Sequence, residues 1–153
     1  MNYTLRGKYL EDFSVGQIIR TGARTVCEGD VSLFAGLTGD YNPLHTNEEF
    51  AKTETVFGTR IAHGLLGLTI MSGLLNQMGY MEGTCIAFIE SSERFKSPLL
   101  FGDTVYCEVE ITDIKYTKKP DRGILTMSNK MYNQRGELVT DQTQVLMMKR
   151  KPV

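Results

Sequence analysis

The sequence has few cysteines, and their number and spacing argue against two common ways of stabilising a small domain. The only three, Cys27, Cys85 and Cys107, lie far apart, and no CxxC pattern or other metal-binding spacing is present. An odd, widely spaced set favours neither a disulfide framework nor a structural zinc site. We therefore expect free thiols in a reducing, cytoplasmic compartment. Cys107 alternates with Val105 and Val109, which predicts a core position on a strand.

An excess of positive charge is also lacking. Seventeen lysines and arginines are balanced by 18 aspartates and glutamates. The lysine-rich stretches at residues 115–119 and 149–151 are short, which is typical of solvated surface. Because a nucleic-acid-binding surface needs a concentrated basic patch, we expect no nucleic acid partner.

Long apolar runs are missing as well. The longest, residues 62–75, is shorter than the roughly 20 residues that cross a bilayer, and it contains His63, three glycines and Ser72. The first residues, MNYTLRGKYLEDF, hold no apolar stretch typical of a secretory signal. We expect no membrane partner. The length of 153 residues, without an internal repeat or linker, predicts one domain spanning residues 1–153.

The first half of the chain predicts one strand and several helices. Residues 17–27 are rich in β-branched side chains and predict a strand. Asp30 is expected to cap a helix that runs to about Gly36. The long connection over residues 39–60 is expected to contain a short helix at residues 48–52, with Asn47 as its N-cap.

A long helix and a run of strands follow. Residues 61–78 are apolar on nearly every face, which predicts a helix buried all round. A period of two then predicts strands, which we place at residues 84–95, 104–114, 123–133 and 137–149. A curved antiparallel sheet wrapped around a long central helix accommodates both patterns. We therefore expect an α+β hot-dog fold, with an α+β sandwich that carries the helix on one face as the alternative.

The stretch GDYNPLH, residues 39–45, carries more reactive groups than a turn requires. Pro43 fixes its own φ and keeps Asn42 out of the helical region, so the polar side chains sit on a stiff loop. The carboxylate of Asp40 and the imidazole of His45 could converge on one water molecule and exchange protons with it. Each residue alone is more often structural, the aspartate as a cap and the histidine as a satisfied core group.

A metal site is a second interpretation of the same residues. Asp40, His45 and His63 could form a two-histidine, one-carboxylate set. The two histidines are not four apart on a helix, and no cysteine lies nearby. We therefore expect no metal.

The stretch RIAHGLL, residues 60–66, opens the apolar helix. The first amides of a helix have no intrahelical partner, and Gly64 has no side chain to cover its own. Such an amide can stabilise a developing oxyanion, although a glycine here could also simply relieve crowding. Ser72 lies further along the helix without a GxSxG elbow around it, so we interpret it as a packing residue or as a hydroxyl that holds a catalytic side chain.

These motifs resemble the MaoC-like, (R)-specific enoyl-CoA hydratase (hydratase 2) family. Residues 34–51, FAGLTGDYNPLHTNEEFA, are similar to its signature: G-D-x-N-P-aliphatic-H, then five residues and alanine. The segment RIAHGLL resembles its second block, and RFKSPLLFGDTV resembles its later strand–turn–strand segment. The resemblance covers residues 9–148, nearly the whole chain.

The resemblance implies reversible syn addition of water to a trans-2-enoyl thioester. It implies that Asp40 and His45 hold the water and move the protons, and that Asn42 orients this pair of residues or the water. It implies further that the Gly64 amide binds the thioester oxygen and that Ser72 supports the histidine. We also expect three residues to contact the substrate: Arg60, His63 and Pro43. No cofactor is implied, because coenzyme A is part of the acyl-CoA substrate.

The resemblance also implies a homodimer or a larger assembly, since family members pair two sheets edge to edge near their active sites. Three competing functions stay open from the sequence. One is a hot-dog acyl-CoA thioesterase. Another is a dehydratase of carrier-protein-bound, branched, dicarboxylic or hydroxylated acyl thioesters. The third is an acyl-thioester binder without catalysis.

Overall fold

The computed structural model describes residues 3–152 and contains one antiparallel sheet, one long helix and several short helices. The elements, in chain order, are η1 (Leu10–Asp12), β1 (Ile18–Thr25), α1 (Glu28–Thr38), α2 (Pro43–Thr46), α3 (Glu48–Glu54), α4 (Gly64–Gln77), β2 (Cys85–Phe95), β3 (Thr104–Tyr116), β4 (Arg122–Tyr132) and β5 (Leu138–Lys149). All strands belong to a five-stranded sheet in the order β1-β3-β4-β5-β2.

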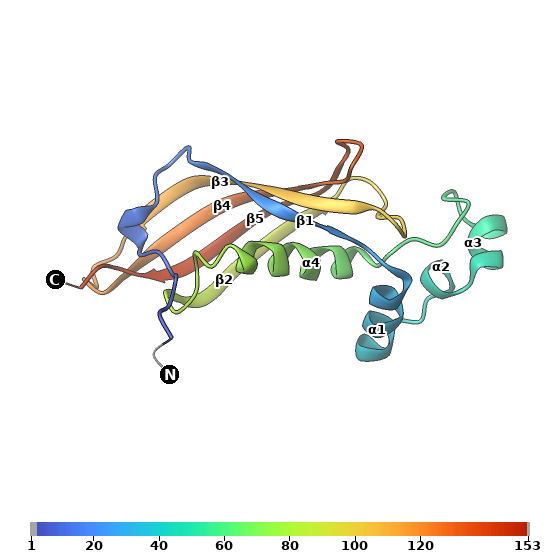
Figure 1. The fold of residues 1–153 in the computed structure, drawn as a ribbon, viewed down its shortest axis with the longest axis horizontal. Coiled ribbons are helices and arrows are strands. Elements are labelled where there is room, and N and C mark those ends of the chain that lie inside the picture. Colours follow the sequence, from blue (N-terminus) through green and yellow to red (C-terminus); the bar gives the residue numbers. More distant parts are fainter. Residues whose placement is uncertain (1–2, 153) are drawn as a thin grey trace.

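The sheet curves along α4, and α1, α2 and α3 lie beyond one end of it (Figure 1). Both termini lie near the opposite end (Figure 1). An antiparallel sheet wrapped around a long helix is the hot-dog fold, so the predicted α+β class and fold are confirmed. Each predicted strand is present within two residues of its expected limits.

The core lies between the inner face of the sheet and α4. On β3, every second side chain is buried, as the alternation predicts. Cys107 is one of these core residues, and burial raises the pKa of its thiol to about 12. Leu10 of η1 is completely buried near Gly123 of β4, at the end of the sheet away from α1.

Two details of the helices differ from the prediction. Cys27, not Asp30, is the N-cap of α1; the Asp30 carboxylate instead accepts a hydrogen bond from the Cys27 amide, and the helix runs on to Thr38. The connection that follows holds a second helix, α2, besides the predicted α3. Asn47 caps α3 as predicted, accepting a hydrogen bond from the Phe50 amide at 3.1 Å.

The prediction that the long helix is buried all round is wrong. One side of α4 packs on the core, whereas Leu65, Ser72 and Gly73 on the other side are exposed. The sheet ends at β2 and therefore does not cover this side of α4. Within residues 3–152 we find no helix with the length and apolar character needed to cross a membrane.

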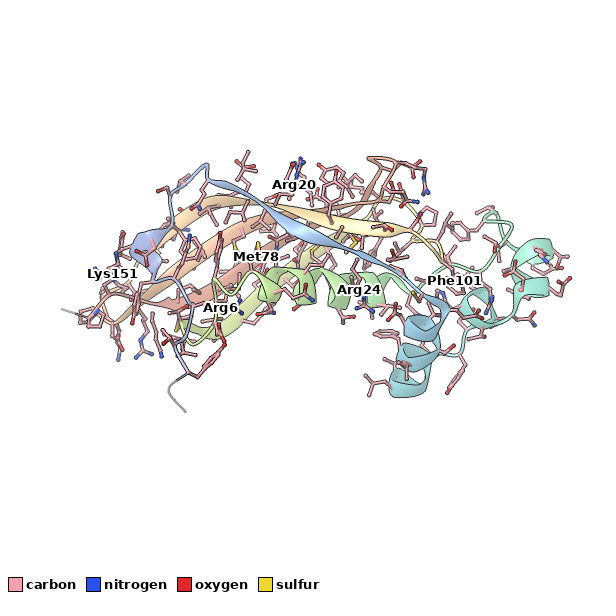
Figure 2. All side chains as sticks on the ribbon, viewed as in Figure 1. Arg6, Arg20, Arg24, Met78, Phe101 and Lys151 are labelled. Atoms are coloured by element: carbon pink, nitrogen blue, oxygen red, sulfur yellow. The ribbon has the colours of Figure 1, made fainter. Side chains whose placement is uncertain are left out.

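The two edges of the sheet differ in character. The β1 edge carries Arg20 and Arg24, which pair with Glu108 and Asp30, and its register shifts between Arg20 and Ala23 (Figure 2). Charges and irregularities of this kind protect an edge strand from pairing. The β2 edge instead exposes large apolar side chains: Ile86, Phe88, Ile89 and Phe95.

Candidate active site

The backbone of the loop between α1 and α2 is fixed by residues at the end of α1 and at the start of α2. Gly39 ends α1 with φ 78°, a left-handed conformation that glycine adopts without steric cost. Asn42 is the N-cap of α2, and its Oδ1 accepts a hydrogen bond from the Leu44 amide at 3.1 Å. Pro43 occupies the first helical position, which suits its fixed φ. The loop therefore presents Asp40 and His45 from fixed backbone positions.

The ring of His45 is oriented by the chain that leads into α4. Its Nδ1 lies 2.7 Å from the carbonyl oxygen of Ile61. A carbonyl can only accept, so Nδ1 carries the proton and a neutral ring has its lone pair on Nε2. This tautomer makes Nε2 of His45 a proton acceptor.

His63 lies beneath His45 and is almost completely buried. It is the N-cap residue of α4, and its Nε2 donates to the backbone carbonyl of Asp40 at 2.9 Å. The two imidazole centroids are 3.8 Å apart, and the ring of Phe34 lies 4.9 Å from His63 on another side. His63 therefore ties the Asp40 loop to the start of α4.

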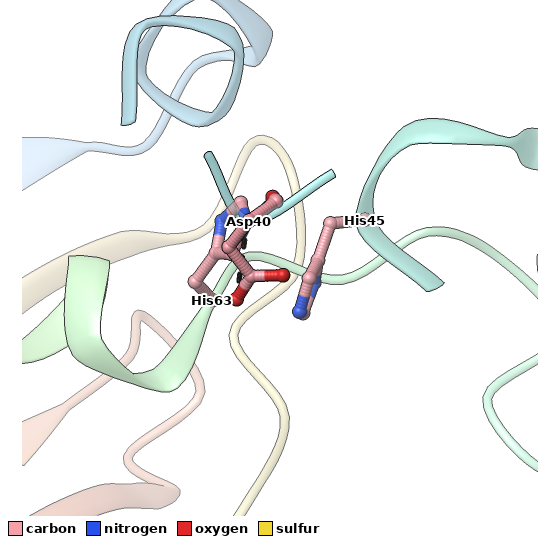
Figure 3. A group of neighbouring side chains, drawn as sticks. All are labelled: Asp40, His45 and His63. Atoms are coloured by element: carbon pink, nitrogen blue, oxygen red, sulfur yellow. Dashed lines mark hydrogen bonds and ion pairs between the residues drawn. The ribbon is translucent and has the colours of Figure 1, made fainter. Parts of the chain in front are cut away.

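The carboxylate of Asp40 completes this group of side chains. Its Oδ1 accepts a hydrogen bond from the Asn42 amide at 3.3 Å, and its Oδ2 lies 4.0 Å from Nε2 of His63. The Asp40 side chain is 52% exposed, so water can reach it. Asp40, His45 and His63, here called the Asp–His–His cluster, each bring a ligand-type atom within 4.8 Å of the others (Figure 3).

The cluster fits proton transfer better than metal binding. An imidazole binds a metal in the plane of its ring, whereas these two rings lie against each other with centroids 3.8 Å apart and planes tilted by 32°. Nδ1 of His45 and Nε2 of His63 already face carbonyl oxygens. The remaining nitrogen of His63, Nδ1, is buried without a partner among the described residues.

A cavity of about 410 Å³ opens beside His45. Its walls are mostly apolar and include Leu44, Ala62, Phe95 and Leu99. Gly64, the first residue of α4, lies on the same cavity, where the first helical amides lack intrahelical acceptors. A bound molecule can therefore contact both the imidazole and an oxyanion-stabilising amide. Phe95 packs so close to Gly64 that a Cβ atom there would lie 3.1 Å from the ring.

Two of the expected site residues do not line the cavity that contains Gly64, although Arg60 borders another cavity together with His45. The Arg60 guanidinium pairs with Glu28 at 2.8 Å and Glu48 at 3.1 Å, and these partners, Glu28 first, raise the pKa of Arg60. Ser72 lies eight residues after Gly64 along α4, on a different cavity. A substrate contact of Arg60 and support of His45 by Ser72 both remain predictions. The same holds for a substrate contact of Pro43.

Two residues near the site went unnoticed in the sequence. Glu48 accepts hydrogen bonds from the Thr59 hydroxyl and the Arg60 amide, which hold its pKa below the usual range. It thereby fastens α3 to the segment that leads to Ile61. Phe95 ends a strand far along the chain, and nothing local indicates that its ring faces Gly64.

The chain is similar to known proteins in both sequence and structure. The family model of the MaoC like domain matches residues 12–131. The chain is 42% identical over 111 residues to an (R)-specific enoyl-CoA hydratase of Rhodospirillum rubrum, covering 72% of this chain and 74% of that protein. It is 36% identical over 128 residues to a protein of the same name from Aeromonas caviae, covering 84% and 90%. A solved structure described as a monoamine oxidase regulatory protein of Archaeoglobus superposes with a TM-score of 0.89 at 35% identity, covering 98% and 100%.

Proposed function

The chain belongs to the MaoC-like domain family, and on that premise we propose that it is an (R)-specific enoyl-CoA hydratase. It adds water reversibly to a trans-2-enoyl-CoA and gives an (R)-3-hydroxyacyl-CoA. One observation carries the proposal: Asp40 and His45 converge beside an apolar cavity that also contains the N-terminus of α4. Such a site can hold an acyl thioester and a water molecule together.

His45 is one half of the proton-transfer pair. Nδ1 of His45 keeps its proton in a hydrogen bond to the Ile61 carbonyl. Nε2 accepts a proton from the water molecule as the water oxygen bonds to C3. The stacked ring of His63 and the Ile61 carbonyl hold the imidazole in place, so little reorganisation precedes the reaction.

Asp40 is the other half. Its carboxylate accepts a hydrogen bond from the same water and holds it over the double bond. The proton that the water loses and the proton that C2 gains are on the same face of the substrate. The pair can therefore relay one proton from oxygen to C2 and return to its starting protonation state. Dehydration runs through the same steps in reverse.

The Gly64 amide provides the electrophilic part of the site. As C3 is attacked, negative charge develops on the thioester oxygen. The free amides and the dipole at the N-terminus of α4 stabilise that charge. The thioester itself acidifies C2, so the proposed reaction requires no metal and no redox cofactor, and coenzyme A enters as part of the substrate.

We propose further that two copies pair through their β2 edges. Phe88 is 54% exposed and Ile89 48%, and Leu65 on the neighbouring face of α4 is 56% exposed. Because β1, at the opposite edge of the sheet, is protected by charges and an irregular register, the apolar β2 edge is the one that favours pairing. We expect a cytoplasmic homodimer that acts on acyl thioesters of fatty acid metabolism. Ile89→Lys should convert the dimer to monomers in light scattering after gel filtration, and an unchanged mass would refute the interface.

The proposed reaction is tested by mixing the purified protein with crotonyl-CoA while following the enoyl-thioester absorbance and free thiol together. Loss of the enoyl signal without thiol release, with (R)-3-hydroxybutyryl-CoA as the product, is the expected result. Thiol release would instead identify a thioesterase. No change in either signal would count against a hydratase of short acyl-CoAs, and crotonyl-ACP is the next substrate to distinguish a carrier-protein dehydratase.

A further inference from the structure

A second cavity, of about 300 Å³, lies between α4 and the β2 and β5 strands, and Phe88 of the proposed dimer interface borders it. Its surface is mostly apolar, like that of the cavity beside His45, and includes Leu68 and Phe88. Most of its lining residues nevertheless carry a polar group: Thr69, Ser72, Ser91, Glu93, Gln142 and Gln144. We call it the polar cavity.

The polar cavity continues the active-site cavity along the same two strands. Phe95 and Thr140 are paired in the β2–β5 register, and both line the active-site cavity. The next rungs on the same face pair Glu93 with Gln142 and Ser91 with Gln144, and these line the polar cavity. Each of these residue pairs lies two residues from the next along β2 and β5, so the two cavities are neighbours on one face of the sheet.

The helix gives the same order. Gly64, Leu68 and Ser72 are spaced four apart and share one face of α4. Gly64 lines the active-site cavity, whereas Leu68 and Ser72 line the polar cavity. At the rise of an α-helix, the polar cavity begins roughly 6 Å and extends to about 12 Å from Gly64. An acyl chain whose thioester oxygen rests on the Gly64 amide can reach it.

A chain of hydrogen bonds runs through the wall of the polar cavity, from the buried Asn129 to Glu93 at the open side. The Asn129 amide donates to Oε1 of Gln142 at 2.9 Å and to Oε1 of Gln144 at 2.8 Å. Gln142 donates to the Ser91 hydroxyl at 3.0 Å, and that hydroxyl donates to Glu93 at 2.7 Å. Asn129 is fully buried, and both glutamines are nearly so. Such a network is costly in a core unless its members find partners.

The direction of this chain decides which group completes it. One branch runs from Asn129 through Gln142 and Ser91 and ends at the Glu93 carboxylate, whereas the other ends at Gln144. Oδ1 of Asn129 is an acceptor with no partner among the described residues. Gln144, whose oxygen accepts from Asn129, still has its amide NH2 group as a donor. A hydroxyl can donate to the carboxylate and accept from this amide at once.

From these contacts we infer that the protein acts on enoyl thioesters whose acyl chain carries a hydroxyl group at its far end. The inference rests on the proposed hydratase function and specifies its substrate class. A plain alkyl tail would remove water from the Glu93 carboxylate and the Gln144 amide and leave both without that partner, which weakens binding. A terminal carboxylate would meet Glu93, and among the described residues no lysine, arginine or histidine lines the cavity to offset the repulsion.

The test compares chains of one length. Binding of octanoyl-CoA, ω-hydroxyoctanoyl-CoA and ω-carboxyoctanoyl-CoA, all unreactive in hydration, is measured by titration calorimetry. Hydration of trans-2-octenoyl-CoA and of its ω-hydroxy derivative is measured beside it. We expect the hydroxylated chain to bind about tenfold more tightly than the plain chain, and kcat/KM to change in the same direction.

Variants locate the effect. Glu93→Leu should remove the preference for the hydroxylated chain while leaving hydration of crotonyl-CoA, which is too short to reach Glu93, unchanged. Glu90→Leu is the matched control, because Glu90 lies on the same strand but pairs with Val145 rather than with the inward-facing row of β5. That variant should keep the preference.

Equal or tighter binding of the plain or carboxylated chain would overturn the inference. So would a preference that survives in Glu93→Leu. Because the binding measurement involves no reaction, it decides this inference even if no substrate is hydrated. The proposed hydratase is refuted separately, if neither crotonyl-CoA nor the two trans-2-octenoyl-CoA substrates are hydrated.

Discussion

Replacing Asp40 by asparagine isolates the charge of the carboxylate from its shape. Asparagine keeps an oxygen that can accept the hydrogen bond now made by the Asn42 amide at 3.3 Å. The bond from Nε2 of His63 goes to the backbone carbonyl of residue 40, so it does not depend on the side chain. The loop and the His45 tautomer should therefore persist, whereas the carboxylate charge that holds the water and takes part in the proton relay is lost.

The size of the effect follows from the role of the group. General acid–base residues contribute about 10²–10⁴ in rate, so kcat for crotonyl-CoA hydration should fall at least about a hundredfold. Binding of butyryl-CoA, which cannot react, should stay close to that of the wild type. Both quantities are measured on one preparation, by enoyl absorbance and by titration calorimetry, and circular dichroism confirms folding.

The matched control is Asp113→Asn, which removes a carboxylate that pairs with Lys115 on β3, remote from the cluster. It should leave kcat unchanged. Wild-type turnover in the Asp40→Asn variant would refute the proton-relay mechanism. A joint loss of turnover and of butyryl-CoA binding would show that the carboxylate acts in binding instead.

Three further predictions concern the site and the fold. Gly64→Ala places a methyl group 3.1 Å from the Phe95 ring and next to the proposed oxyanion amide. We expect kcat/KM to fall about tenfold or more while Tm stays close to that of the wild type. Unchanged kinetics would show that Gly64 has no part in the mechanism. Burial alone would raise the pKa of Asp103, but hydrogen bonds from Arg135, the Leu100 amide and Gln134 outweigh it and lower the pKa. The ionised carboxylate therefore stabilises the fold above its unfolded pKa of about 3.9, and this contribution is lost as pH falls through the lower folded pKa. Asp103→Asn should therefore cost about 2 kcal/mol of unfolding free energy at pH 7 and progressively less in acid, as measured by denaturant titration, and a pH-independent difference would contradict this. Treatment with a chelator should leave hydration unchanged, whereas a loss that zinc restores would make the Asp–His–His cluster a metal site.

Much of the fold could be predicted because the alternation of apolar and polar residues that marks a strand is visible in a short stretch of sequence. The alternation along β3 requires only that one face be buried, and this predicted the core position of Cys107. The face of α4 could not be predicted in the same way. Its residues are apolar or small on every side, so composition alone does not reveal which side the sheet leaves open. That side is set by where β2 ends the sheet.

Some features of the active-site loop could likewise be predicted from local sequence, and others depend on contacts between distant residues. Its reactive residues and stiff backbone follow from a stretch of seven residues, since Pro43 and Asn42 act on their immediate neighbours. The hydrogen bond from His45 to Ile61 and the bond from His63 to Asp40 join residues 16 and 23 positions apart. No local pattern encodes which carbonyl selects a histidine tautomer.

By itself, then, the sequence determined the strands, the order of the elements and the residues that can carry the chemistry, because period, capping and turn preferences act over a few neighbouring residues. Only the tertiary structure decided that Phe95 packs against Gly64, that Arg60 is paired with two carboxylates, and that Asn129, Gln142 and Gln144 are joined by hydrogen bonds. These contacts join segments that meet only when the sheet curves around α4, and their energies depend on burial, which no single segment possesses before the chain has folded.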